Sequence, residues 1–148
     1  LPQLCEATGQ IQPGLNYAKE ITLSARYDVG ETLVLQEDEK AVGLSLVSWF
    51  GNREGMGQDY ASVKALALHP AHTNATHLHA LLDASETLAR ARGKKILIVP
   101  VNAQHAWALT QLLRRGYRVD RASVRMVLEG TGTAFAPDDH VDLSRWAG

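Results

Sequence analysis

The chain has 148 residues, of which 45% are hydrophobic and 21% charged, with a net charge of -1. These values are typical of one globular domain and give no electrostatic argument for nucleic acid or an anionic membrane as a partner. No apolar run approaches the ~20 residues that a membrane-spanning helix needs. Cys5 is the only cysteine, which excludes an intrachain disulfide and favours a reducing, cytoplasmic location.

The first third of the chain predicts helices followed by a hairpin. Residues 1–14 indicate a short helix and a turn, and residues 17–27 favour a second helix. Residues 32–36 are apolar and β-branched, as in a strand, and residues 41–50 alternate as a second strand does. The charged stretch 37–40 between them predicts the turn of an antiparallel hairpin.

Strands and helices alternate in the rest of the chain. Residues 51–57 contain three glycines and predict a surface loop at the mouth of a site. Residues 60–68 predict a third strand, which Pro70 ends because proline has no N–H for the ladder. The apolar spacing from Leu78 to Ala89 then predicts a helix, which ends at Gly93.

The last predicted elements are a strand, a helix and a strand. Residues 96–99 are apolar without alternation, which indicates a central strand covered on both faces. The next helix is expected to end at Gly116. A long strand is expected over residues 118–128, with a tail over residues 129–148. The expected apolar face of the last helix consists of Ala106, Leu109, Leu112 and Leu113.

This order of elements resembles the GNAT acyltransferase superfamily over roughly residues 32–128. Residues 66–70, Leu-Ala-Leu-His-Pro, are similar to the family's apolar-x-apolar-His-Pro strand ending, and residues 80–82 match its small-Leu-Leu step. Ala108, Leu113 and the pair Gly116-Tyr117 are similar to the pattern that ends its last helix.

The resemblance implies an α/β (α+β) fold with a mixed, mainly antiparallel central sheet flanked by helices. One domain would span residues 1–148, with a core over 32–128, a partial helical segment over 1–31 and a tail over 129–148. The family's first strand and first helix are not recognisable before residue 32. The chain then either lacks an N-terminal piece or is the later module of a longer or tandem protein.

The activity implied by the resemblance is direct transfer of an acetyl or other acyl group from coenzyme A to an amine. Acetyl-CoA would be the cosubstrate, and the acceptor a small molecule or peptide. The alternative is a non-catalytic GNAT-fold module that serves a larger or dimeric acyltransferase, as a homodimer or with an N-terminal companion module. A small α/β domain with a different ligand is a third interpretation, which continuous pairing of the third and fifth strands would favour.

The resemblance also implies where the cofactor binds. The strand backbone at residues 66–68 would pair with the pantetheine arm, and amides at the helix N-terminus after residue 72 would face the pyrophosphate. The loop lacks glycine, and the positions that are usually basic or glycine hold Thr73, Asn74, Thr76 and Leu78. A plain strand-to-helix connection with a Thr or Asn cap is the alternative for this loop. The expected cofactor-binding residues are Leu66, Ala67, Leu68, Thr73, Asn74, Ala75, Thr76, His77, Leu78, Asn102 and His105.

No catalytic residue follows from the motifs. The family's tyrosine acid falls on Leu112, which has no proton to give. Candidate bases are Glu54, Asp59 and His72, although solvated loop charges are the alternative for both carboxylates. The spacing of the four histidines between residues 69 and 79 matches no familiar zinc pattern, so we expect no metal site from the sequence.

Overall fold

The computed structural model describes residues 2–11, 16–49, 58–103 and 105–122, and all structural statements below concern these residues. The chain order is helix, helix, hairpin, strand, helix, strand, helix. The elements are α1 (Pro2–Ile11), α2 (Ala18–Tyr27), β1 (Gly30–Glu37), β2 (Lys40–Ser48), β3 (Tyr60–Leu68), the 3-10 turn η1 (Pro70–His72), α3 (Ala75–Ala91), β4 (Ile96–Ile98) and α4 (Ala106–Arg114).

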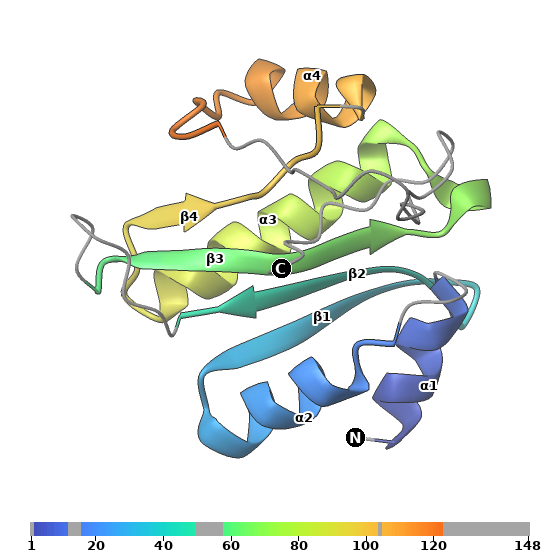
Figure 1. Cartoon of the computed structure of the whole chain (residues 1–148). Coiled ribbons are helices and arrows are strands. Elements are labelled where there is room, and N and C mark those ends of the chain that lie inside the picture. Colours follow the sequence, from blue (N-terminus) through green and yellow to red (C-terminus); the bar gives the residue numbers. More distant parts are fainter. Residues whose placement is uncertain (1, 12–15, 50–57, 104, 123–148) are drawn as a thin grey trace, which may run out of the picture.

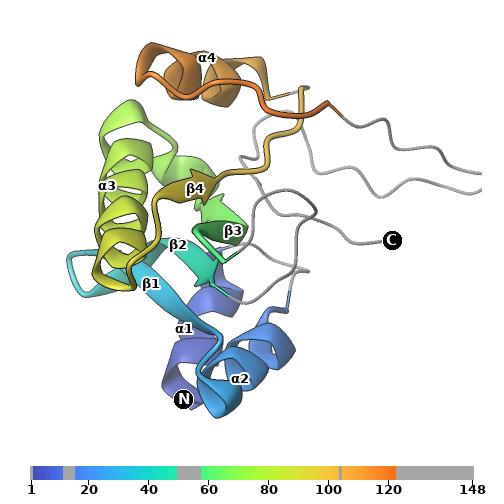
Figure 2. The same ribbon diagram turned by 90° about the vertical axis from the view of Figure 1, so that its left-hand side faces the viewer.

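The sheet has the order β1-β2-β3-β4 (Figure 1). The first three strands are antiparallel neighbours, and β4 runs parallel to β3. Figure 2 shows α3 on one side of the sheet and α1 and α2 on the other side. This arrangement confirms the predicted mixed, mainly antiparallel sheet flanked by helices. No helix in the described part of the chain is long and apolar enough to cross a membrane.

A bulge in β3 allows both faces of the sheet to bury apolar side chains. The β2–β3 register skips Lys64, which is an extra residue on β3. Because the extra residue shifts the alternation by one position, Ala61 and Val63 before it and Leu66 and Leu68 after it all join the core beneath α3. The core on the other face, beneath α1 and α2, consists of Ile11, Tyr17, Ile21, Leu44, Leu46, Ala65 and Ala67.

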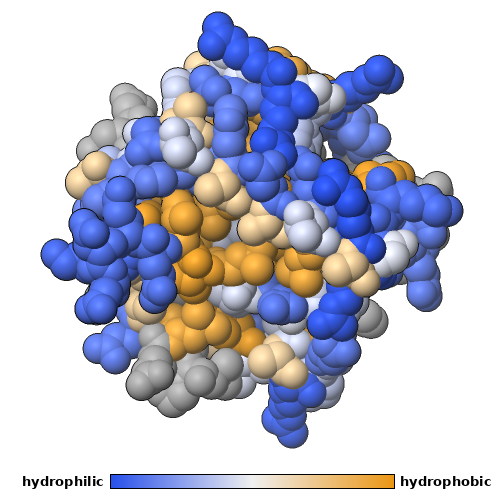
Figure 3. Space-filling model, turned by 180° about the vertical axis from the view of Figure 1, so that it is seen from behind, coloured by the Kyte–Doolittle hydropathy of each residue, from blue (hydrophilic) through white to orange (hydrophobic). Residues whose placement is uncertain are grey.

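The helix α3 lies close to the sheet because β2 offers a glycine beneath it. A Cβ atom on Gly43 would lie 2.8 Å from Leu68 Cδ2 and 3.0 Å from Leu81 Cδ1. Partly buried side chains such as Leu33 and Leu35 on the edge strand β1 complete this core at its margin. On the rear face of the molecule, apolar surface crosses the middle and hydrophilic surface surrounds it (Figure 3).

Most predicted elements are confirmed with small changes in their bounds. Both N-terminal helices form, and the charged stretch 37–40 is the turn of the hairpin, with positive φ at Asp38 and Glu39. The third strand has the predicted bounds, and Gly93 and Gly116 follow their helices with positive φ. The predicted loop at 51–57 and the tail at 129–148 lie outside the described residues.

The prediction of a central strand covered on both faces is wrong for the described part of the chain. Ile96 is 41% exposed, and the other two residues of β4 are only half-buried. The reason is that β4 is three residues long and pairs, among the described elements, with β3 alone. Residues 118–122 form no strand, and the remainder of the last predicted strand lies outside the described residues.

The predicted face of the last helix is partly wrong. Leu112 is buried, but Ala106 is exposed and Leu113 is 47% exposed. Ala108 is fully buried instead. Because positions four apart share one side of a helix, Ala108 and Leu112 form the buried stripe, and Leu113 lies about 100° further around the axis.

Candidate functional site

The strands β3 and β4 pair over a short distance and then part. Their register begins at Tyr60 with Ile96 and ends at Ser62 with Ile98, whereas β3 continues to Leu68. Over residues 63–68, β3 has β2 on one side and no strand partner on the other among the described residues. Backbone N–H and C=O groups on that edge are therefore outside any described ladder.

The three expected residues at the end of β3 can contact a ligand only through their backbone. The side chains of Leu66, Ala67 and Leu68 are fully buried. Leu66 and Leu68 pack beneath α3, and Ala67 packs on the opposite face. Among the described residues, β3 thus combines buried side chains with a backbone edge that has no strand partner, which is the arrangement a strand-like ligand requires.

The loops after β3 and β4 emerge at the same edge of the sheet, because the two strands are parallel (Figure 1). The connection from β3 to α3 carries Thr73 and Asn74, and the connection from β4 to α4 carries Asn102 and His105. Asn102 is exposed and its carbonyl accepts a hydrogen bond from the His105 N–H at 2.9 Å. His105 precedes α4 without a side-chain capping bond. The expected residues from both connections therefore lie at one edge, beside the gap between the strands.

Asn74 is the N-cap of α3. Its Oδ1 accepts a hydrogen bond from the His77 N–H at 2.9 Å, while the Thr73 hydroxyl donates to the His69 carbonyl at 3.2 Å. The N–H groups of Ala75 and Thr76 have no acceptor within the helix and lie at the positive end of its dipole. These two amides are the groups of α3 best suited to an anion.

The loop does not need the glycine that the family usually has. No residue between positions 69 and 78 has a positive φ, and Asn74 itself is extended at φ -149°. Leu78 is fully buried in the core beneath α3, and its N–H donates to the Asn74 carbonyl at 3.1 Å. Leu78 therefore anchors the first turn of α3 from inside and offers nothing to a ligand at the surface.

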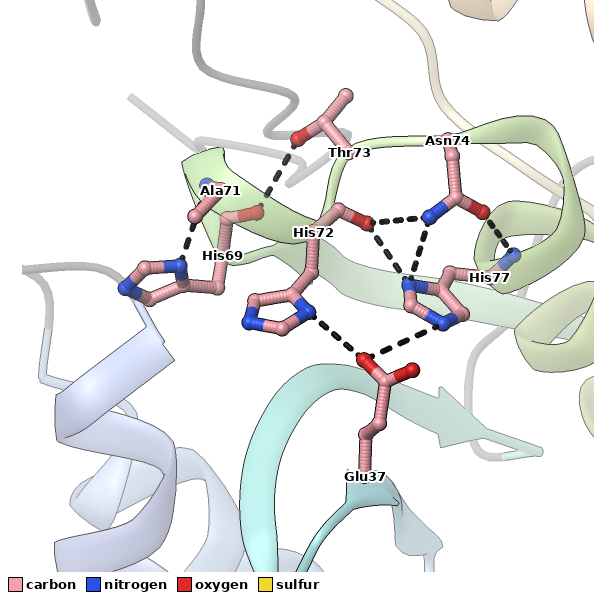
Figure 4. Close-up of polar contacts among 7 residues, drawn as sticks. All are labelled: Glu37, His69, Ala71, His72, Thr73, Asn74 and His77. Atoms are coloured by element: carbon pink, nitrogen blue, oxygen red, sulfur yellow. Dashed lines mark hydrogen bonds and ion pairs between the residues drawn. The ribbon is translucent and has the colours of Figure 1, made fainter.

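The turn before α3 carries a cluster of polar side chains (Figure 4). His72 Nδ1 lies 2.8 Å from Glu37 Oε2, and His77 Nε2 lies 3.8 Å from the same oxygen. His77 Nδ1 also lies 2.8 Å from the His72 carbonyl. His69 is turned aside, and its Nδ1 accepts a hydrogen bond from the Ala71 N–H at 3.2 Å. Sequence analysis missed Glu37, which is 35 residues away from His72; the charged turn 37–40 was its only signal.

The candidate bases lie in three different situations. His72 is in contact with Glu37 at the loop. Asp59 precedes β3 at its far end, and its carboxylate lies 2.9 Å from Lys95 Nζ at an exposed position. Nine residues of strand at ~3.3 Å per residue place Asp59 roughly 30 Å from the loop. Glu54 lies outside the described residues. The structure therefore brings His72, but not Asp59, to the loop edge.

No phenol in the last helix replaces the absent acid. Leu112 is buried in the core. The Tyr117 hydroxyl donates to Glu86 Oε1 at 2.9 Å, and burial, reinforced by this carboxylate, raises the pKa of Tyr117 above its usual value. Arg115 Nε also donates to Glu86 Oε1, at 3.0 Å, and its Nη2 pairs with Asp83. This network fastens the end of α4 to α3 and holds the Tyr117 proton in place.

Comparisons with known proteins give matches by structure. The aminoglycoside N-acetyltransferase AAC(6')-Iy in complex with CoA superposes with a TM-score of 0.66 at 10% identity, over 86% of this chain and 88% of that one. The aminoglycoside 6'-N-acetyltransferase AAC(6')-IG from Acinetobacter haemolyticus gives 0.64 at 11% identity, over 84% and 89%.

A third similar structure is the ribosomal-protein-alanine N-acetyltransferase from Brucella melitensis biovar Abortus 2308. Its TM-score is 0.59 at 17% identity, over 86% of this chain and 88% of that one. No protein-family model and no curated protein matches the sequence. At these identities the likeness shows the fold.

Proposed function

We propose that this chain, which has the fold of the GNAT acyltransferases, transfers an acetyl or other acyl group directly from coenzyme A to an amine. The acceptor is a small molecule or a peptide. One observation carries the proposal: β3 and β4 part after three register pairs, beside the N-terminus of α3. The three similar structures named above support it, since each is an N-acetyltransferase and one is a complex with CoA.

In this proposal the chain binds coenzyme A mainly through backbone groups. The free edge of residues 66–68 pairs with the amides of the pantetheine arm, as an added strand would. The N–H groups of Ala75 and Thr76 face the pyrophosphate, which the helix dipole also favours. Asn102 and His105 flank the arm from the connection after β4. The backbone conformation of the loop itself needs no glycine, because no residue between positions 69 and 78 has a positive φ.

Acyl-coenzyme A supplies the thioester that the amine attacks. The new C–N bond forms as the C–S bond breaks, and coenzyme A leaves as a thiolate that takes a proton from water. The chain aligns the two reactants, and a backbone N–H of the free β3 edge stabilises the oxyanion that develops on the thioester carbonyl. The amine proton leaves through water in this scheme. Leu112 has no titratable group, and the Tyr117 hydroxyl is held by Glu86.

A non-catalytic module of a larger or dimeric acyltransferase is the second candidate. It is favoured by the burial of Leu112 where the family's acid would stand, and by the absence of a basic residue at Thr73 and Asn74. Such a module would keep the fold and the binding edge without turnover.

Calorimetric titration with acetyl-CoA tests the proposal on three forms of the protein. The first is the wild type. The second is Thr76→Glu, which places a carboxylate at the second position of α3, where it suits the helix dipole but repels a phosphate. The third is Thr87→Glu, which adds the same charge at an exposed position further along α3.

We expect one-site binding by the wild type and by Thr87→Glu, and at least tenfold weaker binding by Thr76→Glu. An assay for free thiol with a panel of amines then separates the two candidates. Thiol release above the rate of hydrolysis supports the transferase, and binding without release supports the module. Absence of binding by folded wild-type protein contradicts the transferase and favours a module with a structural role.

A further inference from the structure

We propose that Glu37, His72 and His77 form a binding site for a divalent transition metal ion, for which Zn²⁺ is the best fit. The ion would join the β1–β2 hairpin to the turn before α3. Glu37 is the last residue of β1, His72 the last residue of η1, and His77 lies in the first turn of α3 (Figure 4). The inference does not depend on acyl transfer.

The three ligand atoms already lie close together. Glu37 Oε2, His72 Nδ1 and His77 Nε2 are all within 4.8 Å of one another. Tetrahedral zinc with bonds of about 2.0–2.2 Å places neighbouring ligand atoms about 3.3–3.5 Å apart. The observed separations from Glu37 Oε2, 2.8 Å and 3.8 Å, lie on either side of that value. A shift of about half an ångström by the Glu37 side chain, which is 48% exposed, would bring both separations from Glu37 Oε2 close to that value.

The contacts of His77 Nδ1 bear on the tautomer of the ring. Nδ1 lies 2.8 Å from the His72 carbonyl, which can only accept, and 3.0 Å from Asn74 Nδ2, which can only donate; a metal ion at Nε2 requires the tautomer in which Nδ1 donates to the carbonyl. The Asn74 amide also donates to that carbonyl, at 3.3 Å. In the neutral ring Nε2 then has a lone pair, and this nitrogen faces Glu37. Metal-bound histidines commonly donate their second N–H to a backbone carbonyl in this way, which fixes the ring and its tautomer.

A cation also resolves a mismatch within the cluster. In the neutral tautomer with the proton on Nδ1, His77 Nε2 is an acceptor, and it faces a carboxylate oxygen that is an acceptor as well. An ion between them would replace this contact with two bonds. At His72 Nδ1 the ion would take the place of the proton that a hydrogen bond to Glu37 requires.

The donor set selects the kind of metal. Two imidazole nitrogens and one carboxylate oxygen suit zinc and its neighbours in the first transition row, whereas magnesium and calcium prefer oxygen alone. Three protein ligands leave a fourth position for water. The site is reachable from solvent, since the side chains of His72 and His77 are 36% and 16% exposed.

The test uses metal-stripped protein without a polyhistidine tag. Zn²⁺ binding is measured by calorimetry, and Co²⁺ is added separately to record the visible absorption of a tetrahedral nitrogen–oxygen site. The variants are Glu37→Gln and His77→Gln. Matched controls are Glu39→Gln, which makes the same change two residues away in the hairpin turn, and His105→Gln before α4. Circular dichroism verifies that each variant is folded.

We expect one zinc ion per chain, with affinity at least tenfold lower in both cluster variants and unchanged in both controls. We also expect Mg²⁺ not to compete. Absence of stoichiometric zinc binding by the wild type overturns the proposal. Equal affinity in Glu37→Gln and the wild type overturns it as well, because the carboxylate would then not be a ligand.

Discussion

The hydroxyl of Ser45 on β2 lies 2.8 Å from the hydroxyl of Ser85 on α3, and both side chains are fully buried. The Ser85 hydroxyl donates its proton to the Leu81 carbonyl at 2.7 Å. Ser45 must therefore donate to Ser85. Ser85 thus accepts from Ser45 and donates to Leu81, whereas the bond to Ser85 is the one that Ser45 donates. The two serines share one hydrogen bond between the sheet and the helix, but their loss should have different costs.

Ser85→Ala is expected to destabilise the protein more than Ser45→Ala does. The first change leaves the buried Ser45 hydroxyl without a partner, which costs about 1–3 kcal/mol, whereas the second leaves Ser85 bonded to Leu81 and costs about 0.5–1.5 kcal/mol. Urea unfolding of both single variants and the double variant measures the difference. A larger cost for Ser45→Ala would reverse the assigned donor.

Glu86→Gln is expected to lower stability at neutral pH by about 1–3 kcal/mol. Burial raises the pKa of the Glu86 carboxyl, but the hydrogen bonds from Arg115 and Tyr117 lower it by more, so this pKa lies below its usual value. A carboxyl with a lowered pKa in the folded state contributes stability above its unfolded pKa and loses it as the pH falls through the folded value.

The difference in the free energy of unfolding between the wild type and Glu86→Gln should therefore be largest at pH 7 and become smaller below about pH 4.5. Urea midpoints at several pH values from 7 to 3.5 measure this gap. Glu39→Gln, at the exposed hairpin turn, is the control. A gap that stays constant over this range would show that the carboxylate charge is not what Arg115 and Tyr117 stabilise.

Gly30→Ala is expected to destabilise the start of β1 by about 1–3 kcal/mol. A Cβ atom on Gly30 would lie 2.6 Å from the Val47 carbonyl oxygen, which belongs to the backbone of β2 and cannot rotate away. Gly9→Ala is the matched change, because a Cβ on Gly9 in α1 meets nothing within 4 Å and should stabilise the protein by about 0.5–1 kcal/mol. Thermal unfolding compares the two, and shifts of the same sign would contradict the expectation.

Zinc is expected to stabilise the folded chain if Glu37, His72 and His77 bind it. At a free concentration 100 times the dissociation constant, a ligand specific for the folded state adds about 2.7 kcal/mol. The urea midpoint of the wild type and of Glu39→Gln should rise accordingly, and that of Glu37→Gln should not. A rise of equal size in all three forms would place the zinc elsewhere.

Local signals predicted much of the fold. Pro70 has no N–H for a ladder, and it follows β3 within two residues. The polar pair Thr73 and Asn74 predicted a cap, and Asn74 is the cap of α3. Gly93 and Gly116, placed after the apolar spacing of each helix, have the left-handed backbone that ends them. In each case the deciding interaction lies within a few residues along the chain.

Features that depend on distant partners were not predictable in the same way. The three apolar residues of β4 do not reveal how many neighbours the strand has, and Ile96 is more exposed than a central strand would allow. The contact of Glu37 with His72 requires the hairpin turn and the turn before α3 to meet. Whether the expected cofactor residues bind coenzyme A stays a prediction; in the described part of the chain, β3 has no strand partner on the β4 side beyond Ser62.

The extra residue in β3 also sets the strand's phase. With Lys64 present but no bulge, strict alternation would turn Ala65 and Ala67 towards α3, and both Leu66 and Leu68 would leave the layer they now fill. Before Lys64 the odd-numbered residues of β3 face α3, and after Lys64 the even-numbered residues do. Removing Lys64 would shorten the strand yet keep each apolar side chain on its present face. Keeping Lys64 in a regular strand without the bulge would instead move Leu66 and Leu68 to the opposite face.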